Sequence, residues 1–483
     1  MALFGTDGIR GVVNRELTPA LAAAAGLALA AYLRPATGAS APAILVGRDT
    51  RRSGGMLQGA LEAGVCAAGG IAVDVGVLPT PALAWLAAGG RTAAVMISAS
   101  HNPPEYNGIK MLGPDGMKLP DDVEASLEEM ILAVLGAPGG AGVSVGAGTP
   151  GGGGALGGAD APGGTGLPGG SLAEPLAVGE RRVDVAAAGA YLDFLRARLP
   201  DGLAGLHIVL DCAHGAAYRL APELLAGTGA RLTVLHAEPD GLNINRGCGA
   251  TDPALLAQAV RREGADLGFA FDGDADRCVA VDERGQVVDG DAILAVTALD
   301  RHRRGRLAGP GVVATVMSNL GLERALARHG IALHRTRVGD RYVLEELRRR
   351  GLAVGGEQSG HVIFLDAGQT TGDGLLTMVE VLDVVQRAGR PLSELAAVME
   401  RLPQRLRNLR APDAPRLVEA PGVQAAVDRA RERLAGMGRI LVRASGTEPV
   451  VRVMVEAEDE ALIDEVLADV AAALERAAGG NQA

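Results

Sequence analysis

Three carboxylates stand close together in the stretch "FAFDGDADRC". Asp272, Asp274 and Asp276 alternate directly after an apolar run that is typical of a buried strand. Carboxylates at this spacing repel one another, so a bound cation is the natural way to keep them ionised. Mg²⁺ suits such a loop when the substrate carries a phosphoryl group, because it prefers a few carboxylates together with phosphate oxygens.

Two other interpretations of this loop are a calcium site and a solvated acidic turn. The aspartates match positions 1, 3 and 5 of an EF-hand loop, and Glu283 falls at position 12. Arg277, however, stands where the EF-hand turn needs glycine, and the flanking segments resemble strands rather than helices. A magnesium loop for a phosphoryl substrate therefore fits better.

A second polar loop, "SASHNP", follows the apolar residues 95–97. It offers the hydroxyls of Ser98 and Ser100, and Pro103 and Pro104 stiffen the chain after it. By itself this pattern is also typical of a helix cap. In a chain with a triple-aspartate loop, one of the two serines becomes a candidate carrier of a phosphoryl group.

Two further loops could bind the ends of a small phosphorylated polyol. "GGEQSGH" places Glu357 and Ser359 between glycines, which suits recognition of hydroxyls. "RASGTEP" and the strand after it offer a phosphate cradle made of Arg443, Ser445, Gly446, Thr447 and Arg452. Each motif alone is equally compatible with an ordinary turn.

The segments that carry these loops alternate between strand and helix patterns. "LHIVLDCAHG" and "GVVATVMSN" are two of the predicted strands, and each is followed by a helical pattern. This alternation predicts mostly parallel α/β domains, in which ligands bind beyond the carboxyl ends of strands. The last stretch reads helix, strand, strand, helix, and it predicts a small α+β domain.

The chain has 483 residues, which is too long for a single hydrophobic core. We place the domains at 1–183, 184–296, 297–408 and 409–483. The segment from Gly136 to Ser171 consists mostly of Gly, Ala and Pro. It cannot bury enough apolar area to offset its ordering entropy, so we predict a flexible insertion.

Composition excludes some classes of partner. A net charge of -11 and only 2% aromatic residues argue against nucleic acid binding. The apolar segment that ends at Leu33 is too short and too rich in alanine to span a membrane, and we expect no membrane association. The cysteines have no CxxC spacing, so we expect reduced thiols in a cytoplasmic protein rather than a zinc site or disulfides. They are Cys66, Cys212, Cys248 and Cys278.

Taken together, the motifs resemble the α-D-phosphohexomutase superfamily. They are "FGTDGIRG" (4–11), "SASHNP" (98–103), "NGIK" (107–110), "DGDADR" (272–277), "GEQSGH" (356–361) and "RASGTEPVVRV" (443–453). The resemblance covers nearly the whole chain. It implies four domains around a central cleft, of which three are mixed α/β sandwiches and the last is a smaller α+β domain.

The resemblance also implies a role for each candidate residue. Ser100 would carry the phosphoryl group and would hold Mg²⁺ together with the three aspartates. Lys110, Arg10 and His101 would lie at the transferring phosphate, with Lys110 as a proton shuttle, and Arg277 would neutralise charge there. The residues that would bind sugar hydroxyls are Glu357 and Ser359, and those that would bind the distal phosphate are Arg443, Ser445, Gly446, Thr447 and Arg452.

Gln358 and the stretch "NINRGCGATDP" (243–253) are similar to the phosphoglucosamine branch of the superfamily. That branch implies conversion of glucosamine 6-phosphate to glucosamine 1-phosphate, with glucosamine 1,6-bisphosphate as intermediate and activator. It also implies a role in making amino-sugar precursors of a bacterial cell wall. The oligomeric state stays open, with a homodimer as one alternative.

Three other functions compete with this one. A phosphoglucomutase or phosphomannomutase would share the mechanism. A phosphatase with Asp272 as nucleophile, or a sugar-phosphate sensor without activity, would not need Ser100 together with all three aspartates. We therefore expect a mutase.

Overall fold

The computed structural model describes residues 3–5, 7–37, 41–136, 172, 177–411, 413–445 and 449–479. Within them the chain forms two compact units. The first unit comprises residues 1–287 and 361–386, and the second comprises residues 288–360 and 387–483. The predicted Gly-rich insertion, residues 136–171, lies outside the described residues apart from Gly136, which ends α4.

The first unit begins with a mixed seven-stranded sheet in the order β1-β2-β6-β5-β3-β4-β7. β3 pairs in parallel with β4 and β5, whereas β6 pairs antiparallel with β2 and β5. These pairings place the end of β5, where the SASHNP loop begins, directly beside β6. The strands are β1 (Phe4–Gly5), β2 (Gly8–Val12), β3 (Ala43–Arg48), β4 (Ile71–Val77), β5 (Ala93–Ile97), β6 (Tyr106–Leu112) and β7 (Arg181–Val183).

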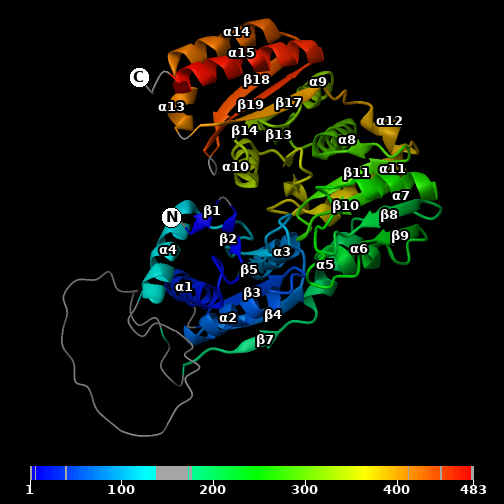
Figure 1. The fold of residues 1–483 in the computed structure, drawn as a ribbon. Coiled ribbons are helices and arrows are strands. Elements are labelled where there is room, and N and C mark those ends of the chain that lie inside the picture. The colour runs from blue at the N-terminus through cyan, green and yellow to red at the C-terminus, as the bar shows by residue number, and fades with distance from the viewer. Residues whose placement is uncertain are drawn as a thin grey trace. The chain divides into compact units, whose positions relative to one another are not determined.

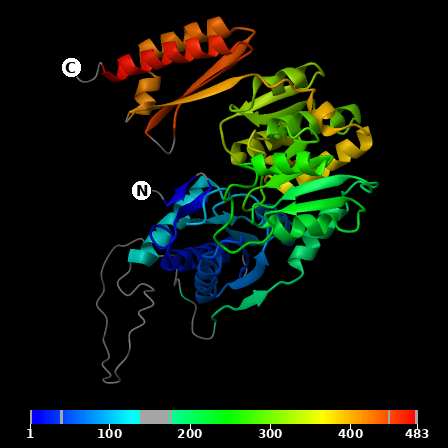
Figure 2. The same ribbon diagram turned by 45° about the vertical axis from the view of Figure 1, so that its right-hand side comes forward.

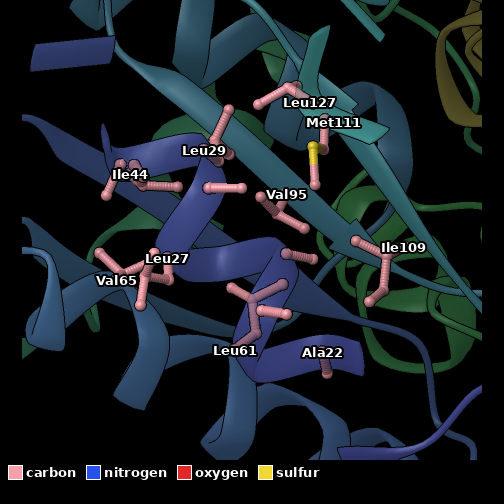
Figure 3. Packing of buried hydrophobic residues seen from close by; sticks show 14 of the residues in the cluster. Ala22, Leu27, Leu29, Ile44, Leu61, Val65, Val95, Ile109, Met111 and Leu127 are labelled. Carbon is pink, nitrogen blue, oxygen red and sulfur yellow. The ribbon is translucent and has the colours of Figure 1, made fainter. Parts of the chain in front are cut away.

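Small residues let the helices of this domain approach closely. A Cβ atom on Gly26 of α1 would lie 2.1 Å from the Leu61 carbonyl oxygen of α2, and one on Gly64 would lie 2.0 Å from the Ala23 carbonyl oxygen. Alanine and leucine therefore fill a core that contains few aromatic side chains. Figure 3 shows Leu61 and Val65 beside Leu27 in this cluster. The helices are α1 (Pro19–Thr37), α2 (Gly54–Ala67), α3 (Thr80–Gly90) and α4 (Asp121–Gly136).

The second sheet of the first unit has the order β12-β11-β10-β8-β9. β10 pairs in parallel with β8 and antiparallel with β11, so the triple-aspartate loop connects two adjacent antiparallel strands. Its strands are β8 (His207–Asp211), β9 (Arg231–Leu235), β10 (Leu267–Phe271), β11 (Cys278–Asp282) and β12 (Val287–Val288). Its helices are α5 (Ala187–Arg196), α6 (Ala217–Leu225) and α7 (Ala254–Glu263).

A later segment, residues 361–386, packs with the first unit. It contains β16 (Val362–Phe364), a short 3₁₀ turn and α11 (Gly374–Ala388). The backbone N–H of Gly374 donates to the carbonyl oxygen of Ala275 over 3.0 Å. The start of α11 therefore supports the triple-aspartate loop.

The second unit contains three parallel strands, with β13 between β14 and β15. The loop with Glu357 follows β15, as the sequence predicts. The strands are β13 (Gly311–Thr315), β14 (Ala332–Thr336) and β15 (Val354–Gly356). The helices of this part are α8 (Gly290–Arg303), α9 (Leu320–Ala327), α10 (Asp340–Arg350) and α12 (Leu392–Ala396).

The C-terminal part of the second unit is a three-stranded antiparallel sheet in the order β17-β19-β18. Figures 1 and 2 both show α14 and α15 side by side along this sheet. The elements are β17 (Gln404–Arg410), α13 (Ala414–Val418), α14 (Pro421–Leu434), β18 (Gly438–Ala444), β19 (Val450–Ala457) and α15 (Glu460–Gly479).

The predicted α/β class and the small C-terminal α+β domain are confirmed. β17 was not predicted, because its sequence "QRLRNLR" is rich in arginine and lacks the apolar alternation of a half-buried strand. Its partner β19 supplies the apolar face instead, with Val451, Val453 and Val455 buried. None of the described helices is long and apolar enough to cross a membrane.

Candidate active site

The SASHNP loop holds its two serines in different environments. Ser98 donates its hydroxyl to Asp49 Oδ2 over 2.7 Å, and its oxygen accepts the backbone N–H of Ser100 over 2.9 Å. The hydroxyl of Ser100 instead donates to Asp272 Oδ2 over 2.7 Å. Ser98 therefore braces the loop, whereas Ser100 presents its oxygen to the aspartate loop.

Ser100 has a left-handed backbone, with φ of 51°. This conformation is costly for a residue other than glycine, so surrounding contacts must enforce it. The Asn245 side chain donates to the Ser100 carbonyl oxygen over 2.8 Å. Gly273 fits beneath the same oxygen, since a Cβ there would lie 2.5 Å from it.

Arg51 ties this loop to the sheet. Its side chain is fully buried and its Nε donates to Asp49 Oδ2 over 2.9 Å. The two terminal nitrogens donate to backbone carbonyl oxygens of the loop, at 2.9 Å for Ser100, 2.7 Å for Asn102 and 3.0 Å for Tyr106. One planar guanidinium therefore fixes the SASHNP loop at several points.

The three aspartates follow β10 and are all buried. Asp274 Oδ2 accepts from Thr80 Oγ1 over 2.6 Å and from Lys110 Nζ over 2.8 Å. Lys110 Nζ also lies 3.5 Å from Asp276 Oδ2. The left-handed Ala275, with φ of 55°, turns the loop so that the carboxylates converge.

Cationic side chains surround this carboxylate group. Arg10 lies on β2 opposite Gly108 of β6, close in the sheet to Lys110. Asp7 joins both cations, through an ion pair with Arg10 and a contact of 3.2 Å to Lys110 Nζ. Arg277 Nε lies 3.9 Å from Asp276 Oδ1.

The environment sets the protonation of these groups. Burial, together with Asp276 and Asp274, raises the pKa of Asp272 well above its usual range. Burial acts in the same direction on Asp274, but Lys110 outweighs it and holds the pKa of Asp274 below its usual range. Burial opposes the charge of Lys110, yet Asp274 and Asp276 raise its pKa, so the ammonium is protonated.

His101 lies beside Ser100, with Nδ1 3.2 Å from Ser100 Oγ. Burial first, and then the positive charges of Arg277 and Arg10, lower the pKa of His101 to about 4. A neutral imidazole can exchange a proton with a neighbouring oxygen.

The aspartate group fits a divalent metal ion. One oxygen from each of the three carboxylates lies within 4.8 Å of the others. Among the described residues, the buried Asp274 Oδ1 and Asp276 Oδ1 have no hydrogen-bond partner. A buried carboxylate oxygen without a partner is costly unless it has a cation to coordinate. The donors are all oxygens, which suits a hard cation.

Comparison with known proteins agrees with this geometry. Four domain profiles of phosphoglucomutase/phosphomannomutase match, for domain I at 1–135, domain II at 190–285, domain III at 289–402 and the C-terminal domain at 406–473. A phosphoglucosamine mutase of Desulforudis audaxviator is 49% identical over 475 residues, covering 97% of each chain. One from Moorella thermoacetica is 48% identical over 481 residues, covering 99% of each chain.

The chain belongs to the phosphoglucomutase/phosphomannomutase family. It is therefore a phosphohexomutase, an isomerase that moves a phosphoryl group. A solved structure of a family protein from Burkholderia thailandensis aligns with a TM-score of 0.79 at 27% identity, covering 99% of this chain and 97% of the other. An Aspergillus fumigatus N-acetylphosphoglucosamine mutase, solved with GlcNAc-6P and magnesium, aligns with a TM-score of 0.64 at 21% identity, covering 99% and 96%. At that identity, the second structure supports the fold alone.

One difference between the family domains and the packing concerns residues 361–386. The domain III profile includes them, but they pack with the first unit and support the aspartate loop. Buried Asp373 accepts from the Tyr191 hydroxyl over 2.8 Å and from Gln369 Nε2 over 2.6 Å. This network fixes the N-terminus of α11, where Gly374 reaches Ala275.

The loops predicted to bind the sugar and the distal phosphate belong to the second unit. Glu357 Oε1 accepts the backbone N–H of Gly339 over 3.1 Å, and Ser359 is exposed. Arg443 and Arg452 pair directly across β18 and β19. Burial and the charge of Arg452 lower the pKa of Arg443. Ser445 follows β18, while Gly446 and Thr447 lie outside the described residues.

Sequence reasoning missed several residues that contact the SASHNP loop, the aspartate loop or the cations beside them. Arg51 and Asp49 belong to the stretch "GRDTR", whose charges resemble an ordinary surface loop. Thr80 begins α3 and resembles a helix start. Asn245 lies within the quoted stretch "NINRGCGATDP", but no role was assigned to it. Asp7 lies within "FGTDGIRG", a quoted motif, but no role was assigned to it. Contacts from distant segments reveal their importance, and no local pattern carries that signal.

Proposed function

We propose that this phosphohexomutase interconverts glucosamine 6-phosphate and glucosamine 1-phosphate through a phosphoserine at Ser100. The observation that carries the proposal is the 2.7 Å hydrogen bond from Ser100 to Asp272 within a buried group of three carboxylates. The substrate follows from the relatives named phosphoglucosamine mutase, which are nearly half identical over almost the whole chain.

The reaction runs in two transfers. First, O1 of glucosamine 6-phosphate attacks the phosphorus on Ser100, the bond between phosphorus and Ser100 Oγ breaks, and glucosamine 1,6-bisphosphate forms. The proton lost from O1 is balanced by the one that Ser100 Oγ gains. Next, Ser100 attacks the 6-phosphoryl group of the turned intermediate, which releases glucosamine 1-phosphate and restores the phosphoserine.

Protein groups stabilise charge and move the proton during each transfer. Lys110 is protonated and paired with Asp274, so we assign it to charge stabilisation at the transferring group, as well as to donating a proton. Neutral His101 lies 3.2 Å from Ser100 Oγ and suits proton exchange with that oxygen. Arg10 and Arg277 neutralise the phosphoryl oxygens.

We assign Mg²⁺ to Asp272, Asp274 and Asp276, together with an oxygen on Ser100. The ion would neutralise charge on the transferring phosphoryl oxygens. The chain's own contribution is to fix these ligands: Thr80 and Lys110 hold Asp274, and the backbone N–H of Arg277 donates to Asp272 Oδ1 over 3.2 Å.

The second unit supplies the substrate contacts in this proposal. Glu357 and Ser359 would bind sugar hydroxyls, and Glu357 can also pair with the 2-ammonium group of glucosamine. Opposed Arg443 and Arg452 suit the distal phosphate, because guanidinium groups bind phosphate oxygens with paired hydrogen bonds. Ser445, Gly446 and Thr447 would complete that cradle.

The organisation proposed from the sequence supports the same function. Domains at 1–183, 184–296, 297–408 and 409–483 would each contribute one loop. The four cysteines form no disulfide, which is consistent with the proposed location in the reducing cytoplasm.

Intact mass and phosphopeptide mapping of the purified chain test the carrier. We expect a single phosphate on Ser100, loss of nearly all turnover in Ser100→Ala, and retained binding of substrate. Ser98→Ala is the matched variant, and it should keep a phosphorylated Ser100 with a lower rate. Phosphate on Asp272 instead would identify a phosphatase, and unimpaired turnover in Ser100→Ala would refute the mechanism.

Substrate choice is tested separately. The values of kcat/KM for glucosamine 6-phosphate, glucose 1-phosphate and mannose 1-phosphate are compared with the bisphosphate activator present. A well-placed charged contact contributes about 1.5–3 kcal/mol, or roughly ten- to a hundredfold in selectivity. Preference for glucose or mannose phosphate would overturn the substrate assignment and leave the phosphoserine mechanism intact.

A further inference from the structure

A second group of metal-ligand side chains lies in the first unit and takes no part in phosphoryl transfer. Asp211 ends β8, His236 follows β9, and Cys248 lies in the loop before α7. One ligand atom from each lies within 4.8 Å of the others. A carboxylate, an imidazole and a thiol thus converge from three separate segments.

The backbone around this group holds the ligands in place. Asp211 is fully buried, and its carboxylate accepts the N–H of Ala213 over 2.9 Å and the N–H of Gly249 over 3.1 Å. His236 adopts a left-handed backbone with φ of 50°, which brings its ring toward Asp211. Such strain in a residue other than glycine requires a compensating contact.

The contact between His236 and Asp211 is short but poorly aligned. The two atoms, His236 Nδ1 and Asp211 Oδ1, lie 3.0 Å apart. Among the described residues, however, the buried Nδ1 has no hydrogen-bond partner with acceptable alignment. An imidazole nitrogen and a carboxylate oxygen that are close but misaligned are arranged as two ligands of one ion would be.

We propose that Asp211, His236 and Cys248 form a binding site for Zn²⁺ or a similar borderline transition-metal ion, with water as the fourth ligand. Thiolate, imidazole and carboxylate are the ligand types that Zn²⁺ takes in tetrahedral sites. The all-oxygen aspartate group prefers a harder cation, so the two sites select different metals. His236 is 23% exposed, which gives the ion a route from solvent.

Metal binding at this group requires the thiolate of Cys248. Burial, and then the charge of Asp211, raises the pKa of the Cys248 thiol to about 12. Without a metal the thiol is therefore protonated and unreactive, and a bound ion would displace its proton.

This metal site is connected to the nucleophile loop through Asn245. The backbone N–H of Asn245 donates to the Ala213 carbonyl oxygen over 3.0 Å, close to Asp211. Its side chain donates to the carbonyl oxygens of Ser100 and Asn102. A metal ion that fastens the 211–214 and 245–249 segments would thus stiffen the support of Ser100.

Cobalt substitution tests the proposal directly. Purified full-length chain is stripped of transition metals, kept in Mg²⁺ and titrated with Co²⁺. We expect a thiolate-to-cobalt charge-transfer band that saturates at a single Co²⁺ and is displaced by Zn²⁺. Cys248→Ser should abolish the band, and His236→Gln should weaken Co²⁺ binding by on the order of tenfold or more.

Two controls separate this site from others in the chain. Cys66→Ser should keep the band, because Cys66 lies on α2 and belongs to no ligand group among the described residues. Asp274→Asn should also keep it, because that change alters the aspartate group. Circular dichroism and melting temperature establish whether each variant is folded. If Cys248→Ser does not fold, Co²⁺ binding by His236→Gln tests the proposal instead, because His236 is partly exposed. The proposal would be overturned if the native chain gave no band, or if folded Cys248→Ser kept the band. Co²⁺ binding by His236→Gln as tight as that of the native chain would also overturn it.

Discussion

Replacing Arg51 should displace the loop that carries Ser100, because the fully buried Arg51 side chain holds that loop in place. The guanidinium contacts Asp49 and the carbonyl oxygens of Ser100, Asn102 and Tyr106, as well as that of Pro103. Arg51→Met removes all of these bonds and leaves the carboxyl group of Asp49 buried without a cation. Arg51→Lys keeps the charge, but a single ammonium cannot reproduce the planar fork.

The size of the effect follows from the burial. Breaking a buried ion pair by removing one partner costs about 3–5 kcal/mol, because the other charge stays buried and uncompensated. Burial already raises the pKa of Asp49 against the opposing charge of Arg51, so Arg51→Met should lead to protonation of that carboxyl, which relieves part of this cost. A displacement of Ser100 by about 1 Å would slow the transfer on the order of a hundredfold.

The assay combines melting temperature with steady-state kinetics. For both Arg51 variants we expect a lower melting temperature and a fall in kcat that exceeds the change in KM. Arg52→Met is the matched control, since Arg52 is the exposed neighbour whose side chain donates to the Asp240 carbonyl oxygen over 3.3 Å and to no other group among the described residues. Arg51→Lys with kcat and melting temperature equal to those of the native chain would refute the reasoning.

Three further predictions concern the same unit. Gly273→Ala should slow turnover with little change in KM, because its Cβ would lie 2.5 Å from the Ser100 carbonyl oxygen. Gly55→Ala is the control and should leave turnover unchanged, because no atom lies within 4 Å of its Cβ. Equal kcat values for the two variants would contradict this prediction. Asp274→Asn should weaken Mg²⁺ binding and lower kcat, and full activity after exhaustive chelation of the native chain would remove the metal from the mechanism. Burial raises the pKa of Asp373 from 3.8 to about 6, so the folded chain holds this proton more tightly than the unfolded chain. The resulting stability is complete below pH 4 and is lost as pH rises through about 6, at most about 3 kcal/mol. Asp373→Asn should remove that slope from melting curves between pH 4 and 7, and an unchanged slope would show that Asp373 ionises normally.

The grouping of the three carboxylates in the aspartate loop could be predicted from sequence because its signal is local. Asp272, Asp274 and Asp276 lie within five residues after an apolar strand, and strand and loop together indicate both the position and the charge of the site. The order of the loops then indicates the family. The strand β17 was not predicted because its own sequence has no alternation of apolar residues. It is held by pairing with β19, whose valines are buried, and the sequence of β17 does not indicate that pairing.

The metal-ligand group of Asp211, His236 and Cys248 shows the opposite situation. The absence of CxxC spacing led to the expectation that no zinc site exists, since that spacing places two ligands on one turn. Ligands on three segments need no common spacing, because the sheet and its loops bring them together. Only the folded arrangement reveals the group, as it reveals the contacts of Arg51.

In the proposed mechanism Ser100 must meet two opposing requirements as a phosphoryl carrier, and its surroundings suit both. The hydroxyl would face three carboxylates and a phosphate, which repel one another, so Lys110 and a metal ion would balance the charge. Neither cation fixes the backbone, which is strained at Ser100. Arg51 and Asn245 hold that backbone by its carbonyl oxygens and leave the hydroxyl free to react. The residues that react are thus separated from the residues that position them, and only the first group carries a motif that can be read from the sequence.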